Sequence, residues 1–338
     1  MNAILTHFTT RKYEREHTWG KDVKSNLFDN DDWLNEDFER ARSPSSNVSS
    51  QYMSLESSWW EQRSWGITTA LDTLEKVSHP LAKIVRDEFE IMKPVPPNTE
   101  HLEIGHVDTM YSCGDNVNIQ FDSTGAMSFL SRNGHVWANE SRCLFELKYR
   151  SYSAENVSSV DYGAPSHVWT TVSIDKDDDL SSSINVEIDM FNKTTTRIPE
   201  GMFVQFRTPR KNVTWSANKL GSWINPSDIV DGGTKHLHGV TEDGLRVQDG
   251  GSTMQISSLD AAVANFGVLD AYPSPVHVTA DTSTYGSSYV LWDNLWGTNY
   301  VMWWPFVVPP PAPYANTGVD FPIDSNNDIK YRFSLNFS

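Results

Sequence analysis

The hydrophobic positions before residue 93 follow the spacing of a helix face. Trp60, Ile67, Leu71 and Leu74 are separated by seven, four and three residues, which is typical of one side of an α-helix. Pro80 suits the first turn of a second helix. The same apolar face then continues through Leu81, Ile84, Val85, Phe89 and Met92. The pattern predicts a helix pair that forms part of a bundle.

The period of the pattern changes after the run Pro94-Val95-Pro96-Pro97, through which no helix continues. From there apolar and polar residues alternate, which is typical of strands with one buried face. Turn signals such as Asn133-Gly134 and Asp243-Gly244 separate the runs. The clearest alternating positions are Val186, Ile188 and Met190; Met202, Val204 and Phe206; and Tyr331, Phe333, Leu335 and Phe337.

The two patterns together predict a mainly β fold with an N-terminal α-helical region. We expect a partial helical bundle over residues 1–93 and a large antiparallel β-sandwich over residues 94–338. The helices are too few to bury their own apolar faces. We expect the sandwich to cover one side of them and another protein surface to cover the rest.

Composition and charge remove several classes of partner. The 338 residues carry 27 Lys and Arg against 44 Asp and Glu, a net charge of −17. This balance argues against nucleic acid and against an anionic membrane surface. No stretch approaches the eighteen apolar residues of a membrane-spanning helix. Cys113 and Cys143 fit either one disulfide bridge or two buried thiols equally well.

Two segments contain histidines in contexts that suit a metal ion. In Glu16-His17-Thr18-Trp19-Gly20 an imidazole lies beside a carboxylate, but taken alone a polar helix end is the favoured interpretation. In Lys235-His236-Leu237-His238 the two histidines share one strand face, and Asp231 or Glu242 would complete a metal site. Exposed strand histidines are the more common case for this spacing.

Two further segments have a structural and a functional interpretation. The run 175–179 begins like a calcium loop, but Leu180 and Val186 replace the required Gly and Glu, so a solvated turn is favoured. The aromatic segment 292–306 suits either a sandwich core or a surface that stacks on sugar rings. The core is favoured, and Trp296, Asn299 and Trp303 are the candidate substrate-binding residues. The sequence contains no G-x-S-x-G, H-E-x-x-H, P-loop or dinucleotide fingerprint.

Several of these stretches, in their order along nearly the whole chain, resemble a known family. The chain resembles the C-terminal two-thirds of glycoside hydrolase family 38-like proteins, and in particular the branch called domain of unknown function 5054. The stretches that carry this likeness are Glu16-His17-Thr18-Trp19-Gly20, Trp59-Trp60-Glu61-Gln62-Arg63, residues 116–130, Leu220-Gly221-Ser222-Trp223, Lys235-His236-Leu237-His238, Ser258-Leu259-Asp260-Ala261 and Asn294-Leu295-Trp296-Gly297-Thr298-Asn299.

The resemblance implies a retaining α-mannosidase type for a full-length relative. Such enzymes have a β/α barrel with an Asp nucleophile, a small helical bundle and a large β-sandwich of the galactose-mutarotase-like supersandwich kind. They hold a Zn²⁺ ion through a His-x-Asp pair and the nucleophile on the barrel, and through a His in the segment that enters the helices. His17 matches that last position.

The sequence departs from this pattern because only sixteen residues precede His17. The barrel, the nucleophile and the His-x-Asp pair are therefore absent from these residues, and the zinc site is incomplete, since a catalytic zinc needs about three protein ligands. We expect the chain to belong with a separate or missing barrel, to act on carbohydrate with it, and to be inactive alone. The alternative is a free-standing carbohydrate-binding or structural β-sandwich module.

Overall fold

The fold is taken from a computed structural model of the chain. It describes residues 36, 40, 43–47, 68–113, 116–151, 164–174, 183–193, 200–230, 233, 235–269, 280–294 and 328–338. His17, Trp296, Asn299, Trp303, Asp231 and the run 175–179 lie outside these residues. None of the helices in the described ranges is both long and apolar enough to cross a membrane.

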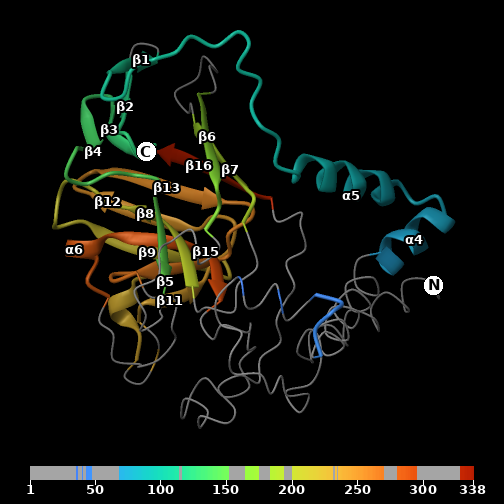
Figure 1. The fold of residues 1–338 in the computed structure, drawn as a ribbon. Helices are drawn as coiled ribbons and strands as arrows, with labels where there is room; N and C mark the ends of the chain where they lie inside the picture. Colours follow the sequence, from blue (N-terminus) through green and yellow to red (C-terminus); the bar gives the residue numbers. More distant parts are fainter. Residues whose placement is uncertain are drawn as a thin grey trace.

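The helical region contains α4 (Thr69–Lys76) and α5 (Pro80–Ile91). Pro80 occupies the first turn of α5, as predicted, and His79 caps the helix by accepting a hydrogen bond at Nδ1 from the backbone N–H of Leu81, 3.2 Å away. An ion pair between Glu75 and Arg86 joins the two helices. Both helices lie to one side of the sheets (Figure 1).

The apolar face of these helices remains exposed. Only Leu71 on α4 and Ala82 on α5 are buried, whereas Ile84 is 59% exposed and Ile91 is 54% exposed. An ion pair of 2.9 Å between Glu88 and Arg332 connects α5 to the sheets. The expectation that the sandwich covers one side of the predicted face is therefore wrong for these positions, because the contact that joins α5 to the sheets is polar.

The described strands form three antiparallel sheets. A four-stranded sheet contains β1 (Tyr111–Cys113), β2 (Val117–Phe121), β3 (Met127–Arg132) and β4 (His135–Ala138). In spatial order, a seven-stranded sheet contains β10 (Ser222–Ile224), β9 (Thr214–Lys219), β12 (Leu245–Asp249), β13 (Ser252–Ser258), β16 (Ile329–Phe337), β7 (Ile184–Phe191) and β6 (His167–Ile174). A five-stranded sheet contains β11 (Leu237–Gly239), β14 (Val263–Phe266), β15 (Ser287–Asn294), β8 (Glu200–Phe206) and β5 (Glu146–Ser151). Two short helical turns, η2 (Pro226–Asp228) and α6 (Thr282–Tyr285), complete the described elements.

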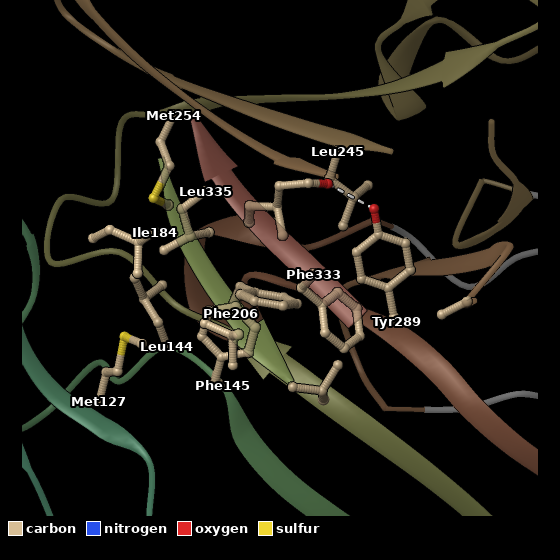
Figure 2. Close-up of a cluster of buried hydrophobic side chains, with 14 of the residues drawn as sticks. Met127, Leu144, Phe145, Ile184, Phe206, Leu245, Met254, Tyr289, Phe333 and Leu335 are labelled. Atoms are coloured by element: carbon tan, nitrogen blue, oxygen red, sulfur yellow. Dashed lines mark hydrogen bonds between the residues drawn. The ribbon is translucent and has the colours of Figure 1, made fainter. Parts of the chain in front are cut away.

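The core includes buried side chains of all three sheets, and Phe and Tyr rings meet where the seven-stranded and five-stranded sheets face each other (Figure 2). Phe333 of β16 packs against Tyr289 of β15 and Phe206 of β8, with ring centroids 5.5 and 6.5 Å apart. The buried Tyr289 hydroxyl donates a hydrogen bond of 2.7 Å to the backbone oxygen of Ile256 on the opposite sheet. These contacts confirm the predicted mainly β, sandwich-like architecture. The division into domains 1–93 and 94–338 stays a prediction.

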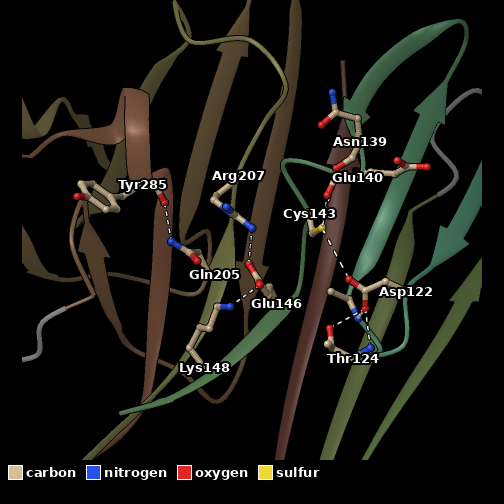
Figure 3. Close-up of polar contacts among 11 residues, drawn as sticks. Asp122, Thr124, Asn139, Glu140, Cys143, Glu146, Lys148, Gln205, Arg207 and Tyr285 are labelled. Carbon is tan, nitrogen blue, oxygen red and sulfur yellow. Dashed lines mark hydrogen bonds and ion pairs between the residues drawn. The ribbon is translucent and has the colours of Figure 1, made fainter. Parts of the chain in front are cut away.

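The predicted alternation is confirmed on β16, holds on β7 except at Asp189, and fails on β8. On β7, Val186, Ile188 and Met190 are buried and Glu187 is half-buried, but Asp189, expected to face solvent, is buried as well. Every residue of β8 is buried, so the positions expected to face solvent are covered as well. Gln205 is one of them, and its Nε2 donates to the backbone oxygen of Tyr285, 2.7 Å away (Figure 3). A central strand covered on both faces gives no clean alternation in burial.

Turn chemistry fixes the register of the hairpins. Asn133 and Gly134, between β3 and β4, have φ values of 51° and 78°, the pair of positive angles that a type I′ turn requires. The predicted turn at Asp243-Gly244 is also tight, because a side chain at Gly244 would collide with the hydroxyl of Tyr289. The turn sequences therefore match the backbone conformations that they were expected to supply.

Candidate functional site

Both histidines of the segment Lys235-His236-Leu237-His238 are buried, which corrects the expectation of exposed strand histidines. His238 Nε2 lies 3.1 Å from the backbone oxygen of Lys235, and its Nδ1 lies 3.5 Å from Nζ of Lys219. Burial lowers the pKa of His238. A neutral ring that donates from Nε2 satisfies both contacts. His238 therefore has a packing role here, edge to face against Phe266.

The described residues contain no group of three or more His, Cys, Asp or Glu side chains placed to hold a metal ion. The predicted zinc ligand His17 and the predicted partner Asp231 both lie outside those residues. The zinc prediction therefore stays untested, as do the substrate-binding candidates Trp296, Asn299 and Trp303.

The two cysteines are free thiols, which decides between the two alternatives left open by the sequence. Cys143 is buried, and its Sγ lies 3.8 Å from the backbone oxygen of Glu140 and 4.0 Å from Oδ2 of Asp122 (Figure 3). Burial raises the pKa of the Cys143 thiol, and the Asp122 charge raises it further. A thiol with a raised pKa is a poor nucleophile at neutral pH. Cys143 therefore serves packing rather than chemistry.

The structure also brings together a groove on the outer face of the seven-stranded sheet. Its volume is about 550 Å³, within the range of about 300–1,000 Å³ that is usual for ligand pockets. Strands β6, β7, β16 and β13 supply its floor, and they are neighbours in the sheet (Figure 1). Apart from the buried Val186, Ser258 and Phe333, the lining residues are Thr171, Ser173, Asn185, Glu187, Glu242, Asp243, Ser257, Leu259, Arg332 and Ser334.

Strand register aligns the floor of the groove into rows. Ser173 pairs with Asn185, Asn185 with Ser334, and Ser334 with Ser257. Directly opposite residues of an antiparallel pair project to the same face, so one row of four short polar side chains crosses four strands. With about 4.8 Å between strands, the row is roughly 14 Å long.

A charged cluster bounds one side of this row. Arg332 makes two hydrogen bonds to Asp260, from Nη2 to Oδ1 at 2.8 Å and from Nε to Oδ2 at 2.9 Å, and its Nη1 lies 2.9 Å from Oε1 of Glu88. The hydrogen bonds to Asp260, with a smaller contribution from Glu88, raise the pKa of Arg332. Two carboxylates therefore fix the guanidinium and leave it little freedom to bind an anion.

The next row along β7 and β16 contains a buried carboxylate. Lys330 Nζ lies 2.8 Å from Oε1 of Glu187 and 3.7 Å from Oδ1 of Asp189. Burial raises the pKa of Asp189 to about 6, since the loss of solvation outweighs the attraction of Lys330. Asp189 does not line the groove. Glu187 does line it, and it shares the cation of Lys330 with Asp189.

Three lining residues have side chains with nothing bound to them in the described part of the chain. The Glu242 carboxylate is exposed, and neither it nor the hydroxyls of Thr171 and Ser173 make a hydrogen bond or ion pair with those residues. Asp243 is held, because its Oδ2 accepts from Nδ2 of Asn218 at 3.3 Å. The groove thus combines fixed polar groups with free ones, an arrangement suited to binding.

Sequence reasoning did not find this groove, because its residues carry no local signal. The residues of its floor are the outward positions of alternating strands, which in sequence look like an ordinary solvated face. Ser257 and Ser173 lie more than 80 positions apart in the chain, and only the strand order of the sheet brings them into one row.

Comparison with known proteins gives a family likeness for the first part of the chain. A family model described as "Domain of unknown function (DUF5054)" matches residues 4–160. This confirms the resemblance to that branch for these residues, whereas the sequence likeness was expected over nearly the whole chain. No curated protein matches the chain.

One solved structure in the comparison is an α-mannosidase from Enterococcus faecalis V583. It is 10% identical, with a TM-score of 0.35, and the similarity covers 70% of this chain. The chain spans about 30% of the length of that protein. Over residues 4–160, therefore, the chain is similar to the DUF5054 family.

Proposed function

We propose that this chain forms the helical and β-sandwich portion of an α-mannosidase-like glycoside hydrolase and acts on carbohydrate together with a β/α barrel. The observation that carries this proposal is the exposed apolar face of α4 and α5, where Ile84 and Ile91 are each more than half exposed. Contiguous exposed apolar surface of this kind marks an interface with another protein surface.

The family likeness supports the same proposal. The match over residues 4–160 includes both helices and the segment Glu16–Gly20. In the resembled enzymes that segment leads from the barrel into the helical bundle. The apolar face on the helices that follow this segment in the chain, from Thr69 onward, is the surface that we assign to the barrel.

In this proposal the chemistry belongs mostly to the barrel. His17 would be one ligand of a zinc ion, and the barrel would supply the remaining ligands and the nucleophile, because one imidazole cannot hold a catalytic zinc. We assign no catalytic acid or nucleophile to residues of this chain.

The experiment measures zinc-dependent hydrolysis of 4-nitrophenyl α-mannoside. The chain is assayed alone and mixed with the β/α barrel of a family 38-like relative whose own helical and sandwich portions have been removed. We expect hydrolysis only in the mixture, with Ile84→Gln/Ile91→Gln weakening assembly and His17→Ala abolishing zinc-dependent turnover without preventing assembly.

Two outcomes would overturn the proposal. Zinc-dependent hydrolysis by the chain alone would contradict the need for a barrel. Failure of any family 38-like barrel to assemble with the chain, in a mixture where that barrel still assembles with its own partner portion, would favour the alternative of a free-standing module.

A further inference from the structure

The groove on the outer face of the seven-stranded sheet has a floor built for many short hydrogen bonds. Ser173, Asn185, Ser334 and Ser257 form one row across four strands. Each hydroxyl offers one donor and two acceptor positions, and each amide offers both kinds of group. A ligand lying along this row meets donors and acceptors at about the spacing of the strands. Such a floor suits a ligand that itself carries many hydroxyls.

The charges around the floor exclude one class of ligand. Glu187, Glu242 and Asp243 line the groove, and the guanidinium of Arg332 is already bound by Asp260 and Glu88. Among the described residues that line the groove, an anionic ligand would therefore meet carboxylates without a free cation to offset them. The exposed carboxylate of Glu242 instead accepts hydrogen bonds from hydroxyl groups, and such charge-assisted bonds are the stronger kind.

The walls of the groove are held in place before a ligand arrives. Asp243 accepts a hydrogen bond from Asn218, and its backbone oxygen accepts one of 3.2 Å from Nε2 of Gln255. Three of the four floor strands, β7, β16 and β13, are inner strands whose opposite face is packed in the core, and β6 with Ser173 is the edge strand of the sheet. A rigid site loses little conformational entropy on binding. Leu259, 66% exposed at the rim, adds an apolar surface for the C–H groups of a ring.

We infer that this groove is a binding site for a neutral saccharide of about two sugar units, separate from any catalytic site on a barrel. The choice of a saccharide over other neutral polyols rests on the proposed function. The site itself rests on the row of floor residues, the free Glu242, Thr171 and Ser173 side chains, and the size of the groove. It would hold carbohydrate on the sandwich while chemistry occurs elsewhere.

The test is calorimetric titration of the full chain, without any barrel, with mannobiose, maltose and lactose, and with digalacturonate as the anionic probe. We expect saturable binding of at least one neutral disaccharide and none of digalacturonate. Ser173→Trp, which fills the row, should abolish the binding. Glu242→Gln, which removes the free charge, should weaken it about tenfold.

Matched controls separate the groove from general effects. Val168→Trp places the same ring on the same strand but on the opposite face, and Glu140→Gln removes an exposed carboxylate outside the groove. Both should bind as the unmodified chain does. If Ser173→Trp loses its folded circular dichroism spectrum, Glu242→Gln decides, since its side chain has no partner to lose in the described residues.

The inference is overturned if none of the three neutral disaccharides binds saturably, or if digalacturonate binds as well as they do. It is also overturned if binding survives in both Ser173→Trp and Glu242→Gln. Because the chain is titrated alone, failure here leaves the hydrolysis experiment untouched. Failure of that experiment likewise leaves this one in place.

Discussion

The helix pair and the sandwich carry the same kind of apolar pattern but differ in whether that pattern is buried. Phe333 of β16 is enclosed between two sheets, 4% exposed, because β8 and β15 place rings opposite it. Ile84 of α5 lies on an equally regular apolar face and is 59% exposed. The difference shows that periodicity identifies the face that favours burial but not the surface that buries it.

The contact that attaches α5 to the sheets also differs in chemistry from the contacts within the sandwich. Phe145, Phe206 and Phe333 hold the sheets together through rings, whereas α5 reaches the sheets through the ion pair of Glu88 with Arg332. Exposed ion pairs contribute little to stability. We therefore expect the two regions to respond very differently to substitution.

The largest effect is expected in the core of the sandwich. Phe333→Ala removes a ring that contacts both sheets and should lower the free energy of unfolding by about 3–5 kcal/mol. The matched change on the helices, Ile84→Ala, should alter it by less than about 0.5 kcal/mol. Urea unfolding followed by circular dichroism measures both. Equal losses of unfolding free energy for the two variants would contradict the difference in burial between the sandwich and the helices.

A second, somewhat smaller effect concerns a buried ion pair in the sandwich. Lys193 and Glu200 form an ion pair and are both almost fully buried, and Tyr149 donates a hydrogen bond to the same carboxylate. Lys193→Met leaves that charge without its cation and should cost about 3 kcal/mol in the same unfolding measurement. Lys193→Met/Glu200→Gln should recover most of the loss, because no buried charge remains. A double variant no more stable than the single one would contradict this.

The third prediction concerns pH and the buried carboxylate of Asp189. Its folded pKa of about 6 lies above the ordinary value of 3.8, so the folded state binds the proton more tightly than the unfolded state. The stabilisation from this group is present below pH 4 and is lost as pH rises through 6. Asp189→Asn should therefore gain about 1–3 kcal/mol relative to the unmodified chain between pH 4 and pH 7.

Urea unfolding at pH 4, 5, 6 and 7 measures this difference, and Glu140→Gln serves as a control, since its exposed side chain has no partner among the described residues. Lys330 keeps its bond to Glu187 in the Asp189 variant, so no unpaired cation is created. A difference between variant and unmodified chain that stays constant with pH would contradict the raised pKa.

The smallest change in stability is expected on α5. Ile91→Gln should alter the free energy of unfolding by less than about 0.5 kcal/mol but reduce self-association, because it breaks the exposed apolar face. Sedimentation velocity at increasing protein concentration measures the association. A large loss of stability would mean that the face is buried in solution and that the contrast between the regions is smaller.

Local features were predictable where chain-neighbouring residues determine them. The start of α5 at Pro80 follows from the fixed φ of proline, and the turn at Asn133-Gly134 follows from the residues that tolerate positive φ. Other features depended on distant residues. His236 and His238 were expected to be exposed and are buried, because the environment of a short strand is set by the segments that cover it.

The candidate groove depends almost entirely on residues that are distant in the chain. Neither Ser173 nor Ser257 carries a signal in its own surroundings, since a serine at an outward strand position is common on any solvated sheet. Their alignment needs the order β13, β16, β7 and β6 in one sheet. That order joins strands far apart in the chain, so no local pattern contains it.

By itself the sequence determined the change from helical to strand periodicity near residue 93, the mainly β class, the acidic charge and the turns. These follow from side-chain chemistry acting over a few residues. Only the tertiary structure decided that the cysteines remain thiols, that β8 is covered on both faces, and that polar residues from four strands form one groove. The physical reason is that burial and register are properties of pairs of segments, and the partner of each segment is fixed only when the sheets assemble.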